Sequence, residues 1–200
     1  MFTVFLVDDD KRVLKALSRL LRAKGYDARP FASAQEFLDR DDLEVPSCAV
    51  FDVSMPCLDG LALQKALTDR GSQRPIIFLT GAGDIPGSVR AMKAGAIDFL
   101  TKPVKEGDLL SAIARAEDVD YRNRQAQGER AVINAKLTTL TPREREVLSH
   151  VVTGRLNKQI AADLGTVEKT IKVHRGRMMA KLGVRTVVDL VRLAEKAGIA

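Results

Sequence analysis

The sequence predicts an α/β domain with a parallel five-stranded sheet, followed by a small all-α domain. Over the first 120 residues, short apolar runs alternate with amphipathic helical patterns, which indicates parallel strands covered by helices on both faces. Beyond residue 120 the strand-like runs stop and the charge changes sign. Residues 1–120 hold 16 Lys and Arg against 19 Asp and Glu, a net −3, whereas residues 121–200 hold 16 against 7, a net +9. The basic second part favours nucleic acid as a partner.

The first domain is expected to alternate five strands with five helices. The strands are expected at residues 3–7, 27–31, 48–51, 76–79 and 99–101. A stripe from Val13 to Leu21 predicts the first helix, and Ser33 with Glu36 reads as a capping box that opens the second. Three further helices are expected over residues 61–69, 85–94 and about 105–119. Five such units fit the flavodoxin-like, doubly wound (βα)5 order.

Polar residues gather where the predicted strands end. The first strand ends in Val7-Asp8-Asp9-Asp10, the third in Asp52, the fourth in Thr80 and the fifth in Thr101-Lys102-Pro103. In a parallel sheet these C-terminal ends converge on one edge. Carboxylates that lie so close repel one another unless a cation sits among them. A divalent ion held by oxygens, usually Mg²⁺, is therefore expected at this edge.

A metal-bound aspartate beside a hydroxyl and a lysine suits an aspartyl phosphate, with Asp52 as the attacking carboxylate. The metal and Lys102 would neutralise the oxygens of the transferring phosphoryl group. A P-loop NTPase is disfavoured because no Gly-x-x-x-x-Gly-Lys-Ser/Thr segment is present. A phosphohydrolase of the haloacid dehalogenase kind needs a second Asp two residues after the nucleophile, where this chain has Ser54. The alternative of a loop aspartate that caps the next helix fits Asp59 better than Asp52.

The order Val-Asp-Asp, Phe-Asp-Val-Ser-Met-Pro-Cys-Leu-Asp-Gly, Leu-Thr-Gly and Thr-Lys-Pro resembles the receiver domain of a two-component response regulator. The resemblance implies that Asp52 accepts a phosphoryl group from a phosphohistidine on a sensor histidine kinase. It also implies that Asp9 and Asp52 bind Mg²⁺ directly. The Ser54 backbone carbonyl would be a further ligand, and Asp8 would act through water.

The same resemblance assigns residues to phosphate recognition and switching. Lys102 would pair with the acyl phosphate, and Lys102-Pro103 would be a cis peptide, an uncommon geometry. Thr80 and Phe99 fall on the family's switch positions, where the hydroxyl moves to the phosphate and the aromatic ring turns inward. Phe99 replaces the tyrosine common there, so a switch based on ring packing is supported and one that needs a phenolic OH is not.

The connector between the two domains is almost wholly polar over residues 120–130. It reads equally as a hydrophilic helix extension or as an inter-domain linker. We expect a receiver domain over residues 1–120, a linker over 121–136 and a second domain over 137–200.

Four helices are expected in the second domain. Thr141-Pro142-Arg143-Glu144 opens the first with a capping box and a proline at the first helical position. Asn157 is expected to cap the second, the third follows Thr166 and runs to about residue 182, and the fourth begins at Thr186. Two short helices joined by a Gly-containing turn predict a helix-turn-helix, whose second helix enters the major groove.

Three strings in this domain, Leu-Thr-Pro-Arg-Glu-Arg-Glu-Val-Leu, Asn-Lys-Gln-Ile-Ala and Thr-Ile-Lys-Val-His-Arg, resemble the four-helix LuxR-type DNA-binding domain. Nearly the whole chain is thus similar to the FixJ/NarL class of transcription regulators. The resemblance implies that Lys172 and Val173 approach base edges, while Lys169 and Arg175 serve the same DNA surface. Gly176 replaces a basic reader found in some members, and the helix over residues 186–197 would dimerise on DNA.

We therefore expect a response regulator in which phosphorylation of Asp52 promotes dimerisation and sequence-specific binding to paired half-sites, with RNA polymerase as a further partner. Two alternatives stay open: a constitutive DNA-binding regulator whose receiver is only a scaffold, and a phosphohydrolase, which Ser54 disfavours. No enzyme activity is expected beyond the receiver's own phosphoryl transfer and slow dephosphorylation. No apolar run approaches the ~20 residues of a membrane span, and Cys48 and Cys57 read as free thiols. We expect no membrane partner and a cytoplasmic location.

Overall fold

The computed structural model describes residues 1–40, 45–81 and 85–199, which form two compact units, Met1–Arg124 and Gln125–Ala200. The first unit contains a five-stranded parallel sheet in the order β2-β1-β3-β4-β5. The strands are β1 (Thr3–Val7), β2 (Asp27–Phe31), β3 (Ser47–Asp52), β4 (Ile76–Thr80) and β5 (Asp98–Thr101). The predicted parallel α/β class is confirmed, with β3, β4 and β5 each one or two residues longer than expected.

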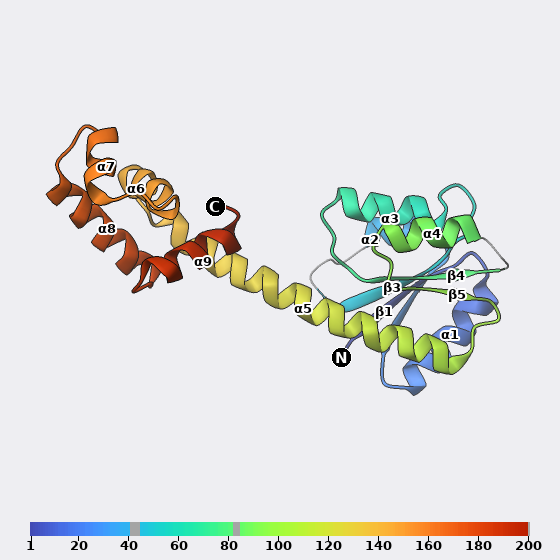
Figure 1. The fold of residues 1–200 in the computed structure, drawn as a ribbon. Coiled ribbons are helices and arrows are strands. Elements are labelled where there is room, and N and C mark those ends of the chain that lie inside the picture. The colour runs from blue at the N-terminus through green and yellow to red at the C-terminus, as the bar shows by residue number, and fades with distance from the viewer. Residues whose placement is uncertain (41–44, 82–84, 200) are drawn as a thin grey trace. The chain divides into compact units, whose positions relative to one another are not determined.

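Helices cover both faces of this sheet (Figure 1). The helices α2 (Ala34–Arg40), α3 (Gly60–Asp69) and α4 (Ile85–Lys93) pack on one face, and α1 (Lys11–Ala23) and the first part of α5 (Glu106–Thr138) pack on the other. Successive strand residues point to opposite faces. Phe51 therefore packs with Phe37 of α2, while its neighbour Val50 packs with Ile113 of α5. Because both faces are buried, polar side chains of the strands collect at the strand ends.

Helix α5 is one continuous helix of 33 residues. Residues 120–130, which the sequence leaves open between a helix extension and a linker, are helical, and α5 continues past residue 119 to Thr138. Polar contacts replace apolar packing there. The Arg124 Nε donates to Asp120 Oδ2 at 2.8 Å, and the same guanidinium donates to the carbonyl of Val45. The end of the apolar stripe is therefore not the end of the helix.

The second unit is all-helical. It contains the C-terminal part of α5 and the helices α6 (Pro142–Val152), α7 (Asn157–Asp163), α8 (Glu168–Leu182) and α9 (Val187–Ala197). Its core is built from apolar side chains of all of these elements, among them Leu137, Val147, Ile160, Ile171 and Leu190. The expected capping box between Thr141 and Glu144 is present, and a second one between Thr186 and Asp189 opens α9.

The expectation that Asn157 caps the second helix of this unit is wrong. The N-cap of α7 is Leu156, whose backbone N–H is accepted by Gln159 Oε1 at 2.9 Å. The Asn157 side chain instead accepts a hydrogen bond from Arg175 Nη1 of α8 at 2.9 Å, a partner that lies 18 residues away in the chain. The Asn157 side chain thus makes a tertiary contact instead of the cap that the local sequence predicts.

Within the described ranges, every helix is too short or too polar to traverse a lipid bilayer.

Candidate functional site

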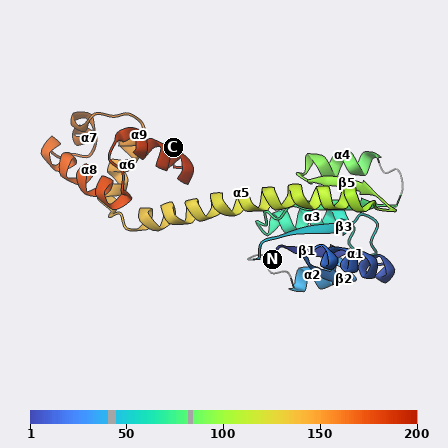
Figure 2. The same cartoon turned by 90° about the horizontal axis from the view of Figure 1, so that it is seen from below.

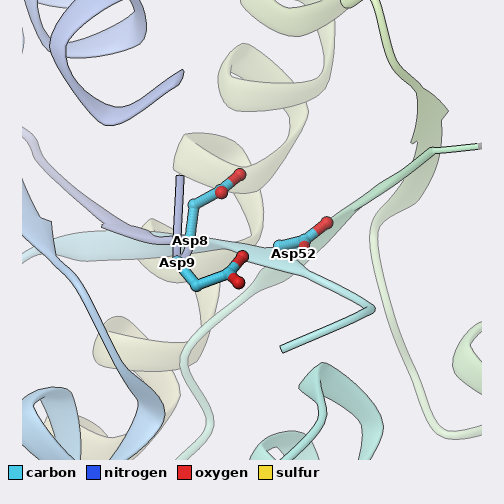
Figure 3. Close-up of side chains that lie close together, drawn as sticks. All are labelled: Asp8, Asp9 and Asp52. Carbon is cyan, nitrogen blue, oxygen red and sulfur yellow. The ribbon is translucent and has the colours of Figure 1, made fainter. Parts of the chain in front are cut away.

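Three carboxylates meet at the C-terminal edge of the sheet (Figure 3). Asp8 and Asp9 directly follow β1, and Asp52 is the last residue of β3. These two strands are neighbours in register, with Val7 opposite Phe51, so the residues that follow lie side by side. One oxygen of each carboxylate lies within 4.8 Å of the others. Asp8 and Asp52 are only 3% and 4% exposed, whereas Asp9 is exposed.

Lys102 reaches this acidic cluster from the end of β5. Its backbone N–H donates to the carbonyl of Thr80 at 2.7 Å, and the Lys102-Pro103 peptide is cis. The Lys102 Nζ lies 2.6 Å from Asp8 Oδ2 and 2.9 Å from Asp52 Oδ1. One ammonium thus bridges the two buried carboxylates.

Ionisation at the site reflects burial and this bridge. Burial raises the pKa of Asp8, although hydrogen bonds from Lys102 and from the Asp10 backbone N–H act in the opposite direction. Burial also disfavours the charged form of Lys102, but its hydrogen bonds to Asp8 and Asp52 outweigh that effect and raise its pKa. Three carboxylates against one ammonium leave negative charge to be compensated. The oxygen donors fit a hard divalent cation such as Mg²⁺.

A hydroxyl and an aromatic ring come from the two strands on the other side of Asp52. Thr80 is the last residue of β4, which pairs with β3 through Asp52 and Leu79, and it is 3% exposed. Phe99 lies on β5 with a half-buried ring, and its ring centroid is 6.0 Å from that of Phe78. The structure thus places a buried hydroxyl and a core-packed ring at this end of the sheet.

The segment after Asp52 contains a steric constraint at Gly60 that the sequence does not reveal. The sequence predicts a turn at Asp59-Gly60 with Asp59 as the cap of the next helix, and Asp59 is indeed the N-cap of α3, accepting from the Ala62 N–H at 2.7 Å. Gly60 has a second role, because a Cβ at this position would lie 2.4 Å from the carbonyl oxygen of Asp52. The one local signal is the glycine itself, a residue typical of places where backbone segments approach closely. Ser54 is exposed two residues beyond Asp52.

The residues predicted to contact DNA all lie on α8. Lys169 is exposed, Val173 is 45% exposed, and the Lys172 Nζ lies 3.1 Å from the Glu168 carboxylate one turn earlier. Arg175 differs from them because its guanidinium is engaged with Asn157. A base or phosphate contact by Arg175 would therefore have to share this guanidinium or break its bond to α7.

A doubly wound parallel sheet with a lysine-bridged acidic edge, joined to a helix-turn-helix unit, defines the class of two-component response regulators. Comparisons with known proteins agree. Residues 4–114 match the family described as response regulator receiver domain, and residues 138–194 match the bacterial regulatory proteins of the luxR family.

Similar proteins extend over nearly the whole chain. Nodulation protein W of Bradyrhizobium diazoefficiens is 44% identical over 196 residues, covering 98% of this chain and 86% of that protein. Transcriptional regulatory protein FixJ of Azorhizobium caulinodans is 37% identical, covering 98% and 93%. A low-resolution structure of the response regulator StyR has a TM-score of 0.81 at 45% identity and covers 98% of both chains. Full-length FixJ from B. japonicum has a TM-score of 0.59 at 37% identity and covers 99% and 98%.

The chain belongs to the FixJ-type response regulators, which join a receiver domain to a LuxR-family DNA-binding domain. It is a transcriptional regulator rather than a metabolic enzyme. Its two domains imply a kinase as one partner and DNA as the other.

Proposed function

We propose that Asp52 is the phosphoacceptor and that its phosphorylation controls DNA binding. The observation that carries the proposal is the position of Lys102, whose Nζ lies between Asp8 and Asp52 at 2.6 and 2.9 Å. A surface carboxylate would need no such buried counter-charge. The Asp52 carboxylate attacks the phosphorus of a phosphohistidine on the sensor histidine kinase, so that an O–P bond forms, the P–N bond breaks and the imidazole leaves with the electron pair.

The neighbouring residues hold the metal and the phosphoryl group. Asp9, Asp52 and the backbone carbonyl of Ser54 would hold Mg²⁺, and Asp8 would assist through water. The chemistry that a bound Mg²⁺ would supply is neutralisation of charge on the phosphoryl oxygens. Lys102 leaves its bridging position and pairs with the acyl phosphate. The receiver thereby catalyses its own phosphoryl transfer and slow dephosphorylation.

The switch residues Thr80 and Phe99 couple phosphorylation of Asp52 to the rest of the receiver domain. The Thr80 hydroxyl donates to the phosphoryl group, and the ring of Phe99 turns further inward against Phe78. The face that contains α4 and β5 then rearranges and dimerises the receiver. A shift in the populations of two receiver states is sufficient for this.

The dimer binds paired half-sites on DNA in the cytoplasm. Lys172 and Val173 approach base edges from α8, and Lys169 and Arg175 contact phosphates, which position the helix without specifying sequence. Helix α9 pairs the two copies on DNA, and RNA polymerase is the further partner through which transcription responds.

The proposal is tested by incubating the chain with Mg²⁺ and acetyl phosphate and locating the label by mass spectrometry. Wild type and the Asp59→Asn control are expected to be labelled on Asp52, and Asp52→Asn is expected to remain unlabelled. The control removes a carboxylate seven residues away that serves as a helix cap. Equal labelling of Asp52→Asn and wild type would remove Asp52 as the acceptor.

A further inference from the structure

We propose that a groove between α1 and the β2–α2 segment binds a small organic anion, a carboxylate or phosphate group on an apolar body. Figure 2 shows β2, α1 and α2 together at the outer edge of the sheet. The groove between them has a volume of about 650 Å³. This size is typical of small-molecule sites, which range over roughly 300–1,000 Å³.

The groove combines an apolar floor with a cationic rim. We call its apolar lining, which includes Pro30 of β2 and the buried Leu14 of α1, the floor, and most of the lining surface is apolar. The rim carries four cationic side chains, all from one face of α1: Lys11, Lys15, Arg19 and Arg22. An apolar body can lie on such a floor while its acidic group faces the rim, where ammonium and guanidinium groups bind carboxylate or phosphate well.

A buried hydroxyl in the groove lacks a partner. Ser18 lines the groove and is 5% exposed, and within the described part of the chain its Oγ has no hydrogen-bond partner. Such groups are rare because a buried polar atom without a partner is costly. A ligand oxygen that reaches the groove floor would satisfy it. A flat protein surface laid across the rim would not reach it, which favours a small ligand.

Three of the four rim cations differ from the cations elsewhere on and near α1. Arg12 is paired with Asp10 at 2.9 Å, and Lys24 with Glu106 at 2.7 Å. For Lys11, Lys15 and Arg19 the structure shows no carboxylate within 4.0 Å among the residues it describes. Helix α1 itself contains no acidic residue, and the lining has the single carboxylate of Glu36 against four cations, so the groove presents a net positive charge to an anion.

The other polar groups at the groove are already engaged. Glu36, a carboxylate in its lining, accepts from the Ala32 N–H at 3.1 Å and lies 3.6 Å from the Arg40 guanidinium. The carbonyl of Ala28 on β2 accepts from Arg22 at 2.9 Å, and Pro30 has no N–H to offer. The outer edge of β2 is therefore poorly suited to pair with an extended peptide, which again favours a small molecule.

Residue-resolved NMR of the full-length protein, without Mg²⁺ and at low salt, tests the proposal. The probes are hexanoate and hexyl phosphate, with acetate, inorganic phosphate and 1-hexanol as comparisons. We expect hexanoate or hexyl phosphate to shift the amides of Lys15, Ser18 and Ala32, with an affinity about tenfold above that of the bare anions. Whichever of these two probes binds more tightly identifies the acidic group that the groove prefers, a carboxylate or a phosphate. Hexanol, which has no charge, is expected to bind weakly.

Variants separate this site from general charge attraction. Lys15→Gln and Arg19→Gln are expected to weaken binding about tenfold, and Ser18→Ala is expected to weaken it without loss of fold. The matched control Arg12→Gln removes a cation of the same helix that does not line the groove, and it should bind the probes like wild type.

Three results would overturn the proposal. The amide signals of the groove residues do not shift, Arg12→Gln weakens binding as much as Lys15→Gln and Arg19→Gln do, or a hexaglutamate peptide binds the groove and the hexyl anions do not. No phosphate donor or DNA is used, so either result leaves the role of Asp52 untouched.

Discussion

Gly60 lies against the backbone of Asp52 so closely that a Cβ at position 60 would stand 2.4 Å from the Asp52 carbonyl oxygen. A second obstacle is the ring of Phe78, whose Cε1 would lie 3.1 Å away. The Gly60 N–H also donates to the carbonyl of Val53 at 3.1 Å. The start of α3 is thereby fixed against the end of β3. The backbone path at Asp52 therefore leaves no room for a side chain eight residues later.

We predict that Gly60→Ala destabilises the receiver domain and slows phosphorylation of Asp52. Because backbone and an aromatic ring block the new methyl group, the expected loss is about 1–3 kcal/mol in the free energy of unfolding, measured by urea denaturation. The matched control is Gly107→Ala near the start of α5, where a Cβ meets open space. This control should be neutral or slightly stabilising. Equal stability of the two variants would mean that the close approach to Asp52 is unimportant.

Removal of Lys102 should strengthen metal binding while it weakens phosphorylation. In Lys102→Ala the ammonium no longer competes with a cation for the oxygens of Asp8 and Asp52, so we expect Mg²⁺ affinity to rise about tenfold. The affinity is measured by calorimetry or by amide shifts at pH 7.5. Labelling by acetyl phosphate should fall, because the phosphoryl oxygens lose their counter-charge.

The control for this variant is Lys105→Ala, which removes an exposed lysine three residues further along the chain. Its Mg²⁺ affinity should equal that of wild type. If both variants bind Mg²⁺ like wild type, the bridge of Lys102 to the two carboxylates does not oppose the metal.

The second domain should depend on pH through Glu144. This carboxylate is 2% exposed, lies 2.6 Å from the Lys181 Nζ and accepts from the Thr141 N–H at 2.8 Å. The Lys181 hydrogen bond, aided by that of Thr141, lowers the pKa of Glu144. Because the folded pKa lies below the unfolded value of about 4.3, these contacts stabilise the domain above that value. Their contribution is lost as the pH falls through the folded pKa.

Glu144→Gln is therefore expected to lower stability by about 1 kcal/mol at pH 7 and to reduce the pH dependence below pH ~4.3. Thermal unfolding between pH 3 and 7 measures both. Glu146→Gln is the control, since its pair with Arg143 at 2.8 Å is half exposed and should contribute little. A Glu144→Gln profile that parallels wild type at every pH would contradict the role of this buried pair.

The strands and the acidic edge could be predicted because they follow from local composition. A parallel strand buried on both faces is a continuous apolar run, and the ends of such strands meet at one edge, so Asp8, Asp9 and Asp52 had to converge. The contact of Gly60 with Asp52 could not be predicted, because it depends on the path of the loop between them.

Two further features involve side chains whose partners lie far away in the sequence. Helix α5 continues past its apolar stripe through the Asp120–Arg124 pair and the bond of Arg124 to the Val45 carbonyl. Asn157 leaves its expected cap to accept from Arg175. Periodicity and capping rules describe neighbours in the chain, and these partners, apart from the Asp120–Arg124 pair, are distant in sequence.

The central claim is that phosphorylation of Asp52 licenses DNA binding, and recovery of genomic DNA fragments by the purified full-length protein tests it most directly. Wild type and Asp52→Asn are each compared with and without acetyl phosphate and Mg²⁺. We predict that the phosphate donor enriches a defined set of fragments about tenfold for wild type and changes nothing for Asp52→Asn. The same fragments recovered equally well in all four samples would contradict the claim, and would show that the LuxR-family domain binds DNA whatever the state of the receiver.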